Sequence, residues 1–215
     1  MTMHARPRER FTRRPADAVT AVIALEVLVL AMVAVRDGTV SDPEREAFRA
    51  VNDLPAALYP VLWPFQQLGA VLVGPLLAIV AFALRHVRLG VALLLGTAAK
   101  LGLERLVKEV VSRPRPGTSI GRDIHARGTV SLHGPSFVSG HAVLVAALAC
   151  LIAPYLRGRW RVLPWAIVAV VMVTRVYVGA HNPLDVIGGA ALGIVIGGCL
   201  NLIVGVPEAG VHGEV

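Results

Sequence analysis

The sequence predicts an all-α membrane protein in which six transmembrane helices form a bundle. Three observations support this fold class: 55% of the 215 residues are hydrophobic, only 16% are charged, and the mean hydropathy is +0.67. Soluble globular domains are more polar than this, whereas repeated apolar runs of membrane length account for the balance. The two cysteines, Cys150 and Cys199, both lie inside apolar runs and form no disulfide or metal-binding pattern.

Six apolar segments are each close to the length that crosses ~30 Å of hydrocarbon. They cover residues 18–35, 68–84, 89–107, 139–156, 162–179 and 184–206. The first follows a basic region but has no clear small-residue cleavage site, so we expect a retained signal-anchor. It carries Glu26, which we expect to face the bundle interior. A basic tail (1–17), a membrane domain (18–206) and a C-terminal tail (207–215) complete the predicted organisation.

Arginines in three short regions account for much of the net charge of +7. They are Arg6, Arg8, Arg10, Arg13 and Arg14 in the N-terminal tail, Arg85 and Arg88 in one connector, and Arg157, Arg159 and Arg161 in another. Basic residues in short loops mark the cytoplasmic side, and six spans place all three regions there. The predicted location is therefore the plasma (inner) membrane, with both termini cytoplasmic. This topology explains the charge better than nucleic-acid binding does.

Two longer loops, residues 37–67 and 108–138, are then predicted on the periplasmic or extracellular face. Apolar residues at helical spacing in the first loop predict a short amphipathic helix on the outer membrane surface, flanked by interfacial aromatic anchors. The apolar residues are Phe48, Val51, Leu54 and Leu58, and the anchors are Tyr59 and Trp63.

Gly189, Gly193 and Gly197 form a stripe at four-residue intervals in the last apolar segment. Small residues at this spacing let another helix approach closely. The stripe predicts packing within the bundle, with a homodimer contact as the alternative.

Three polar stretches that are far apart in the sequence are predicted to meet at the outer face. The third segment ends there in "KEVVSRPRP", the fourth begins there with "SGH", and "TRVYVGAHNPLD" joins the fifth and sixth. Lys108, Arg115 and Arg175 would supply three positive charges suited to a phosphate or diphosphate. Ser139 is expected at a helix N-cap, where the Gly140 amide would face an anion.

The same face would carry a reactive histidine pair. Asp185 lies one helical turn after His181, so its carboxylate could orient the imidazole as a nucleophile. His141 is then placed to protonate a leaving oxygen as a general acid.

These stretches resemble the signature of the type 2 phosphatidic acid phosphatase superfamily, which shares its site with vanadium haloperoxidases. The first motif, Lys-x6-Arg-Pro, matches Lys108 to Arg115 and the following proline. The second, Pro-Ser-Gly-His, appears as "VSGH", with Val138 in place of proline. The third, Ser-Arg-x5-His-x3-Asp, appears as "TRVYVGAHNPLD", with Thr174 in place of serine. Neither departure removes an ionisable group.

The resemblance implies a six-helix bundle and a phosphohistidine formed on His181 and oriented by Asp185. It also implies that His141 protonates the leaving group, and that no metal or other cofactor is needed. The implied ligands of the phosphoryl oxygens are Lys108, Arg115, Ser139, Gly140 and Arg175.

Other polar residues near these motifs receive more modest roles. Arg113 is expected to be a loop or headgroup contact, and Lys100 with Glu104 an interior ion pair. The eight-residue spacing of His125, His133 and His141 matches no common zinc pattern. Loop residues between positions 122 and 133 are expected to shape substrate access; they are Arg122, Asp123, His125, Arg127 and His133.

The sequence thus predicts a membrane enzyme that removes phosphate from a lipid phosphate or diphosphate at the outer face, in contact with membrane lipids. A polyprenyl substrate, undecaprenyl or decaprenyl diphosphate or phosphate, suits this orientation. Phosphatidic acid or phosphatidylglycerol phosphate is the second choice. A lipid phosphotransferase and a small transporter or channel remain as alternatives, while a haloperoxidase would need vanadate and is usually soluble.

Overall fold

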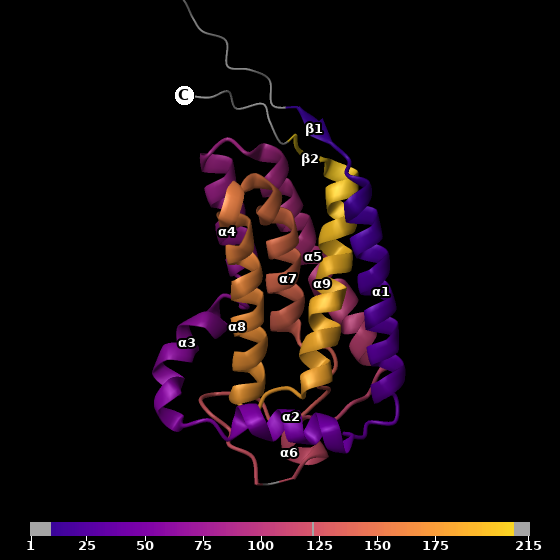
Figure 1. Cartoon of the computed structure of the whole chain (residues 1–215), viewed down its shortest axis with the longest axis vertical. Coiled ribbons are helices and arrows are strands. Elements are labelled where there is room, and N and C mark those ends of the chain that lie inside the picture. The colour runs from indigo at the N-terminus through magenta and orange to yellow at the C-terminus, as the bar shows by residue number, and fades with distance from the viewer. Residues whose placement is uncertain (1–9, 122, 209–215) are drawn as a thin grey trace, which may run out of the picture.

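The structure, a computed structural model, describes residues 10–121 and 123–208. Within these residues, six helices run along one axis and alternate in direction (Figure 1). They are α1 (Pro15–Val35), α4 (Val73–Ala83), α5 (Val87–Val110), α7 (Gly140–Ile152), α8 (Leu163–Tyr177) and α9 (Pro183–Val204). The alternation brings residues from distant parts of the chain to the same end of the bundle. Parts of the predicted tails (1–9 and 209–215) and Arg122 lie outside the described residues.

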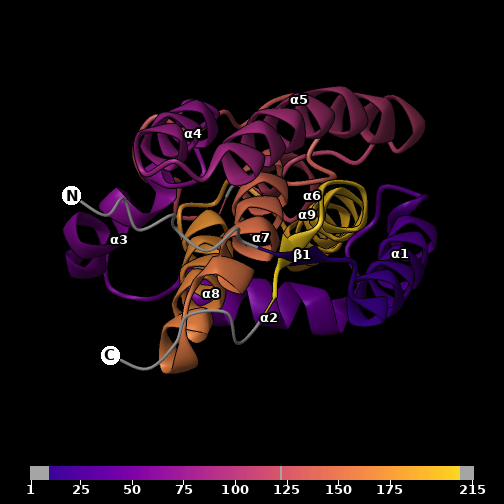
Figure 2. The same ribbon diagram turned by 90° about the horizontal axis from the view of Figure 1, so that it is seen from above.

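Helix α7 forms the centre of the bundle, as the view from above shows (Figure 2). Every residue from Ala142 to Leu151 is buried, and α5, α8 and α9 all pack against this helix. The α9 glycine stripe makes the closest of these contacts, since a Cβ atom on Gly193 would lie 2.3 Å from the Val143 carbonyl oxygen. The stripe therefore packs within the bundle as predicted, and its three glycines are buried there.

The described chain is mostly helical and contains helices suited to a membrane. By length and composition, α1, α9 and the segment Gly158–Tyr177 could each cross a bilayer, while Val73–Ala83 and Gly140–Tyr155 are apolar but shorter. The predicted helix over 68–84 is only partly correct, because residues 68–72 form turns and α4 begins at Val73. Eleven residues of helix extend only ~16 Å.

Short helices close the end of the bundle at which α1, α5 and α8 finish. Helix α2 (Asp42–Asn52) lies across this end beside α6 (Pro116–Ser119) (Figure 1). The 3-10 turn η1 (Ala56–Leu58) and helix α3 (Tyr59–Gln67) follow α2. Helix α2 is shorter than the predicted amphipathic helix, because it ends before Leu54 and Leu58. Its buried face carries Glu44, Phe48 and Asn52. Two of these three are polar, and Glu44 contributes to the site described below.

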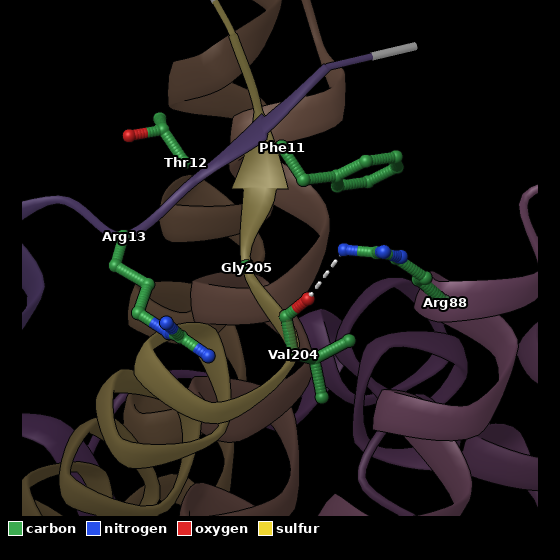
Figure 3. Close-up of a pocket in the computed structure, with 6 residues that line it drawn as sticks. All are labelled: Phe11, Thr12, Arg13, Arg88, Val204 and Gly205. Carbon is green, nitrogen blue, oxygen red and sulfur yellow. Dashed lines mark hydrogen bonds between the residues drawn. The ribbon is translucent and has the colours of Figure 1, made fainter. Parts of the chain in front are cut away.

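The opposite end of the bundle is held by backbone pairing and arginines (Figure 3). Strand β1 (Phe11–Thr12) pairs antiparallel with β2 (Val206–Pro207). Arg13 Nε donates to the Leu202 carbonyl at 2.8 Å and Arg88 Nη1 to the Val204 carbonyl at 3.1 Å. These bonds satisfy carbonyl groups that the last turn of α9 leaves unpaired.

Short connections at this end of the bundle carry clustered arginines. Arg85 lies between α4 and α5, and Arg88 lies in the first turn of α5. The turns η2 (Ala153–Tyr155) and η3 (Gly158–Val162) connect α7 to α8 and carry Arg159 and Arg161. These arginines therefore gather at the end of the bundle opposite α2 and α6.

Candidate active site

The three predicted motifs meet at the end of the bundle that α2 and α6 cover. The last turns of α5 carry Lys108, the N-terminus of α7 carries Gly140 and His141, and Arg175 lies in the last turn of α8. Helix α9 begins at the same end and carries Asp185 in its first turn. Helix direction alone explains this convergence, because each motif lies where a long helix begins or ends.

His181 lies in the short loop between α8 and α9, and a serine connects it with Asp185. The distance from His181 Nδ1 to Asp185 Oδ2 is 3.7 Å, too long for a hydrogen bond. Ser136 Oγ lies 3.4 Å from His181 Nδ1 and donates a hydrogen bond to Asp185 Oδ2. The same carboxylate oxygen accepts the Asn182 amide at 2.7 Å. The predicted pair is thus a group of three, in which Ser136 stands between the imidazole and the carboxylate.

The position of Asp185 follows from helix capping. Asn182 is the N-cap of α9 and Pro183 its first residue, as the sequence predicted. Asp185 is the third helical residue, where a carboxylate can accept the N-cap amide. The backbone amide of Ser139 donates to the Asp185 carbonyl at 2.9 Å, which ties the start of α7 to the start of α9.

Arg113 is the positive counterpart of this carboxylate, and the prediction of a loop or headgroup contact is wrong. The Arg113 side chain is excluded from solvent, with Nη1 2.9 Å from Asp185 Oδ1 and 3.0 Å from Glu44 Oε1. Its guanidinium binds Glu44 through two nitrogens, and Glu44 also accepts the Leu184 amide at 2.9 Å. The two carboxylates hold the pKa of Arg113 above its ordinary value against the effect of burial. Helix α2 is thereby joined to α9 beneath the site.

The electrostatics around His181 favour a neutral ring. Burial, together with the positive charges of Arg175 and Arg115, lowers the pKa of His181 to about 4, and Asp185 opposes that shift only in part. At neutral pH the imidazole is therefore uncharged. Because Nδ1 faces Ser136, Nε2 carries the free lone pair.

The start of α7 provides a helix N-terminus without side-chain obstruction. Ser139 is the N-cap as predicted, yet its side chain makes no cap hydrogen bond. Within the described residues, its buried hydroxyl has no partner. A Cβ atom on Gly140 would clash with the carboxylate of Glu104, so the glycine lets this side chain lie directly against the start of α7. Buried donors in proteins are nearly always satisfied, so the unpaired hydroxyl indicates a place for a ligand.

Arg175 and Arg115 contact backbone and side-chain oxygens but keep donor groups available. Arg175 Nη1 donates to Gln66 Oε1 of α3 at 2.9 Å. Its buried Nε has no partner within the described part of the chain. Arg115 Nη1 donates to the Ala180 carbonyl at 2.9 Å and Nε to the His133 carbonyl at 3.1 Å. Burial lowers the pKa of Arg115, while Asp185 and Glu104 raise it.

Lys108 forms part of a charged row along α5. Glu104 lies between two lysines, 2.6 Å from Lys108 Nζ and 2.7 Å from Lys100 Nζ. The predicted interior ion pair of Lys100 with Glu104 is present. A cavity of about 500 Å³ is lined by all three side chains and by Pro135, so Lys108 borders open space.

His141 is half-buried at the start of α7 and interacts electrostatically with Arg175 and His181. The turn between α3 and α4 covers its ring: a Cβ atom on Gly69 would lie 2.6 Å from His141 Cδ2. Glycine at this position lets the turn lie directly on the imidazole.

The loop between α6 and α7 is fixed by one arginine. Arg127 Nη1 donates to the carbonyl groups of Asn52 and Tyr177 at 2.8 and 2.6 Å, and its guanidinium lies 4.1 Å from the centre of the Tyr177 ring. These contacts attach the loop to the ends of α2 and α8. Across the described residues, no group of three or more His, Cys, Asp or Glu side chains is placed to hold a metal ion.

Three contributors to the site were not identified from the sequence: Ser136, Glu44 and Gln66. Ser136 lies only two residues before the second motif, and this proximity is the one available signal. Glu44 and Gln66 lie in the loop that was interpreted as a membrane-surface segment. Only the packing of α2 and α3 on the bundle reveals them.

Comparison with known proteins defines the class. Residues 85–206, more than half of the chain, match the PAP2 superfamily, and the chain therefore belongs to that superfamily. This confirms the resemblance inferred from the three motifs.

Relatives of known structure share the fold. The crystal structure of Aquifex aeolicus LpxE has a TM-score of 0.60 and 27% identity, over 71% of this chain and 90% of that one. The transmembrane PAP2 type phosphatidylglycerolphosphate phosphatase from Bacillus subtilis has a TM-score of 0.66 over 85% of this chain and 94% of that one. Its 21% identity shows a common fold alone.

A curated relative adds a short local match. The lipid A 4'-phosphatase of Porphyromonas gingivalis is 34% identical over 64 residues, which are 28% of this chain. The match spans about a quarter (26%) of that protein's length.

Proposed function

We propose that this protein is an integral membrane phosphatase that removes phosphate from a lipid phosphate or diphosphate through a phosphohistidine at His181. One observation carries the proposal: Asp185 holds the neutral imidazole of His181 through Ser136. The backbones of Asp185 and His181 contact Ser139 and Arg175, and the buried Ser139 hydroxyl and Arg175 Nε have no partner among the described residues. Membership of the PAP2 superfamily supports the same reaction class.

The arrangement assigns a role to each nitrogen of His181. Nδ1–H would donate towards Ser136 Oγ, which in turn donates to Asp185, so Nε2 attacks the phosphorus. A P–N bond forms as the bond from phosphorus to the leaving oxygen breaks. His141 donates a proton to that oxygen. Water then attacks the phosphohistidine and gives a proton to His141, the P–N bond breaks, and phosphate leaves with both histidines restored.

The phosphoryl oxygens would be held by positive charges and helix amides. We assign Lys108, Arg115 and Arg175 as cationic ligands, with the Ser139 hydroxyl and the Gly140 amide as neutral donors. These groups act most strongly on the charge that develops in the transition state. The chain's own residues suffice for this scheme, and we propose that it needs no metal.

We propose six membrane spans, with the site on the periplasmic or extracellular face and both termini in the cytoplasm. The different charges of the two bundle ends support this orientation. Helix α2 would then lie near the outer surface, and α3 with α4 would complete the short second span. A lipid substrate can reach such a site with its tail still in the bilayer.

For the substrate we propose a polyprenyl diphosphate or phosphate, which suits an outward-facing site in an envelope-producing cell. A saccharolipid or glycerolipid phosphate is the second candidate, because the relatives named above are a lipid A phosphatase and a phosphatidylglycerolphosphate phosphatase. Transfer of the phosphoryl group to an acceptor alcohol would use the same phosphohistidine. Its product is a phosphorylated alcohol, whereas hydrolysis releases phosphate. A transporter or channel would move solute without releasing phosphate.

A substrate panel tests the proposal. Purified protein in detergent with chelator is offered undecaprenyl diphosphate, undecaprenyl phosphate, phosphatidic acid, phosphatidylglycerol phosphate and lipid A, and phosphate release is measured. We expect turnover of at least one lipid, loss in His181→Ala, and slow turnover in His141→Ala. Trp160→Ala, at an exposed position at the opposite end of the bundle, serves as the control and should retain full activity. Undiminished turnover in His181→Ala would falsify the mechanism.

A further inference from the structure

Helix α1 carries a carboxyl group in the middle of its outer surface. The expectation that Glu26 faces the bundle interior is wrong, because α1 packs on α9 through Ala21, Ala24, Leu28 and Ala31 and Glu26 is exposed. At 1.5 Å per residue, Glu26 lies ~16 Å from the start of α1 and ~14 Å from its end. In a membrane-spanning helix this is the centre of the bilayer.

The residues around Glu26 form a regular seam. On the side opposite α9, residues recur at alternating intervals of three and four, which is the heptad spacing of a left-handed helix pair. They are Val19, Val22, Glu26, Val29 and Val33. All four valines are strongly exposed, from 48% at Val29 to 57% at Val19 and Val33. Glu26 is the single polar member and lies at the centre.

A carboxyl group cannot remain without a partner in hydrocarbon at small cost. Ionisable side chains within spanning helices nearly always face a protein interior or another polar group. Within residues 10–121 and 123–208, Glu26 makes no hydrogen bond or ion pair, and Figure 2 shows α1 at the edge of the bundle. No residue of the described part of the chain therefore supplies the partner that this carboxyl group needs.

We propose that α1 is a homodimer interface, in which two copies pack their Val19–Val33 seams in parallel and pair their Glu26 side chains at the crossing point. A second copy meets each requirement of the seam. Two copies inserted in the same orientation present the same residue at the same depth, which a two-fold axis normal to the membrane brings together. A carboxyl group that holds a proton donates to its twin and accepts in return, so the contact is self-complementary.

The valines set the geometry of the contact and the glutamate sets its register. Apolar packing alone drives helix association weakly in lipid, because the lipid tails are equally apolar, whereas polar contacts across helices stabilise it. A single polar residue in an apolar seam fixes which residues face each other. The seam lies on the side of α1 that faces away from α9 and uses no residue assigned to catalysis, so the dimer and the proposed reaction can be tested independently.

The first test measures association in vesicles. Donor- and acceptor-labelled full-length protein is reconstituted at increasing lipid-to-protein ratios, and energy transfer gives the dissociation constant in mole-fraction units. Glu26→Leu is expected to raise that constant about tenfold, the equivalent of a polar contact of ~1.4 kcal/mol. Glu26→Gln keeps a hydrogen-bond donor and an acceptor, so its dissociation constant should be close to that of the unchanged protein. Leu30→Ile, at an exposed neighbour outside the seam, is the matched control.

The second test locates the contact. In a background of Cys150→Ala and Cys199→Ala, single cysteines at Val22 and Val29 are oxidised with copper phenanthroline in the membrane. Both should give disulfide-linked dimers, while a cysteine at Ile79, an exposed position on α4, should not. A protein that is monomeric at every lipid dilution, or a Glu26→Leu variant that associates unchanged, would overturn the proposal. Preferential cross-linking at Ile79, or cross-linking of α1 to a different protein alone, would also overturn it.

Discussion

Arg113 and Asp185 form an ion pair that is completely withdrawn from solvent, with 2.9 Å between Nη1 and Oδ1. Arg113 lies just after α5 and Asp185 in the first turn of α9, so the pair joins two helices that carry different motifs. Glu44 of α2 binds the other edge of the same guanidinium. The proposed catalytic carboxylate is therefore held by a charge network that extends to the helix covering the site.

Loss of Arg113 should unfold the protein more readily, because both carboxylates would remain buried without a counter-charge. We expect Arg113→Met to cost about 3–5 kcal/mol of unfolding free energy. The measurement is thermal unfolding in detergent, followed by circular dichroism. Arg105→Met is the control, since Arg105 pairs with Glu109 on the exposed surface of α5, and it should change stability by no more than about 0.5 kcal/mol. Equal shifts in the two variants would show that the buried network is not stabilising.

Ser136 should matter for rate although it belongs to no family motif. Ser136→Ala removes the hydroxyl between His181 Nδ1 and Asp185 Oδ2. A lost hydrogen bond to a charged group costs about 1.5–3 kcal/mol, which corresponds to a decrease of about ten- to a hundredfold in kcat. Steady-state phosphate release measures this decrease in kcat. Ser131→Ala changes an exposed serine in the same loop and should leave kcat unchanged. A similar decrease in kcat in this variant would mean that the conformation of the loop, rather than the Ser136 hydroxyl, determines the rate.

The acid limb of the pH profile should report His181. Its pKa of about 4 already reflects a favourable contribution from Asp185, which raises the value. Asp185→Asn removes that contribution, so the pKa falls further and protonation begins at lower pH. We therefore expect the acid limb of kcat/KM to move to lower pH while the plateau drops by at least about a hundredfold. Asp123→Asn, in the exposed loop, provides the control profile. An acid limb that moves to higher pH would contradict the assigned environment.

Labelling should reveal which membrane side carries the site. In a background without native cysteines, Ala126→Cys lies at the site end and Arg157→Cys at the arginine-rich end, and both positions are exposed. An impermeant maleimide added to intact cells should modify position 126 and spare position 157 until the cells are lysed. The reverse pattern would turn the site towards the cytoplasm and remove the argument for an envelope lipid.

The positions of the long helices could be predicted because apolar runs of membrane length are a local property of the sequence. Five of the six predicted segments coincide closely with helices, and the exception, 68–84, contains Gly69 in a turn that packs on His141. That turn is imposed by a contact with α7, which local hydrophobicity does not encode. The glycine stripe of α9 likewise indicated close packing, but only the structure shows that α7 is its partner.

The sequence by itself determined the family, the proposed nucleophile and the residues proposed to bind phosphate, because the three motifs have fixed spacings at helix ends. Tertiary structure decided how these groups are held: Ser136 between His181 and Asp185, Arg113 between Asp185 and Glu44, and Gln66 on Arg175. It also decided that Glu26 faces outward, since a hydrophobic run does not reveal which side of a helix meets the bundle. These contacts join residues as many as 109 positions apart, and such pairings depend on how whole helices pack rather than on any local pattern.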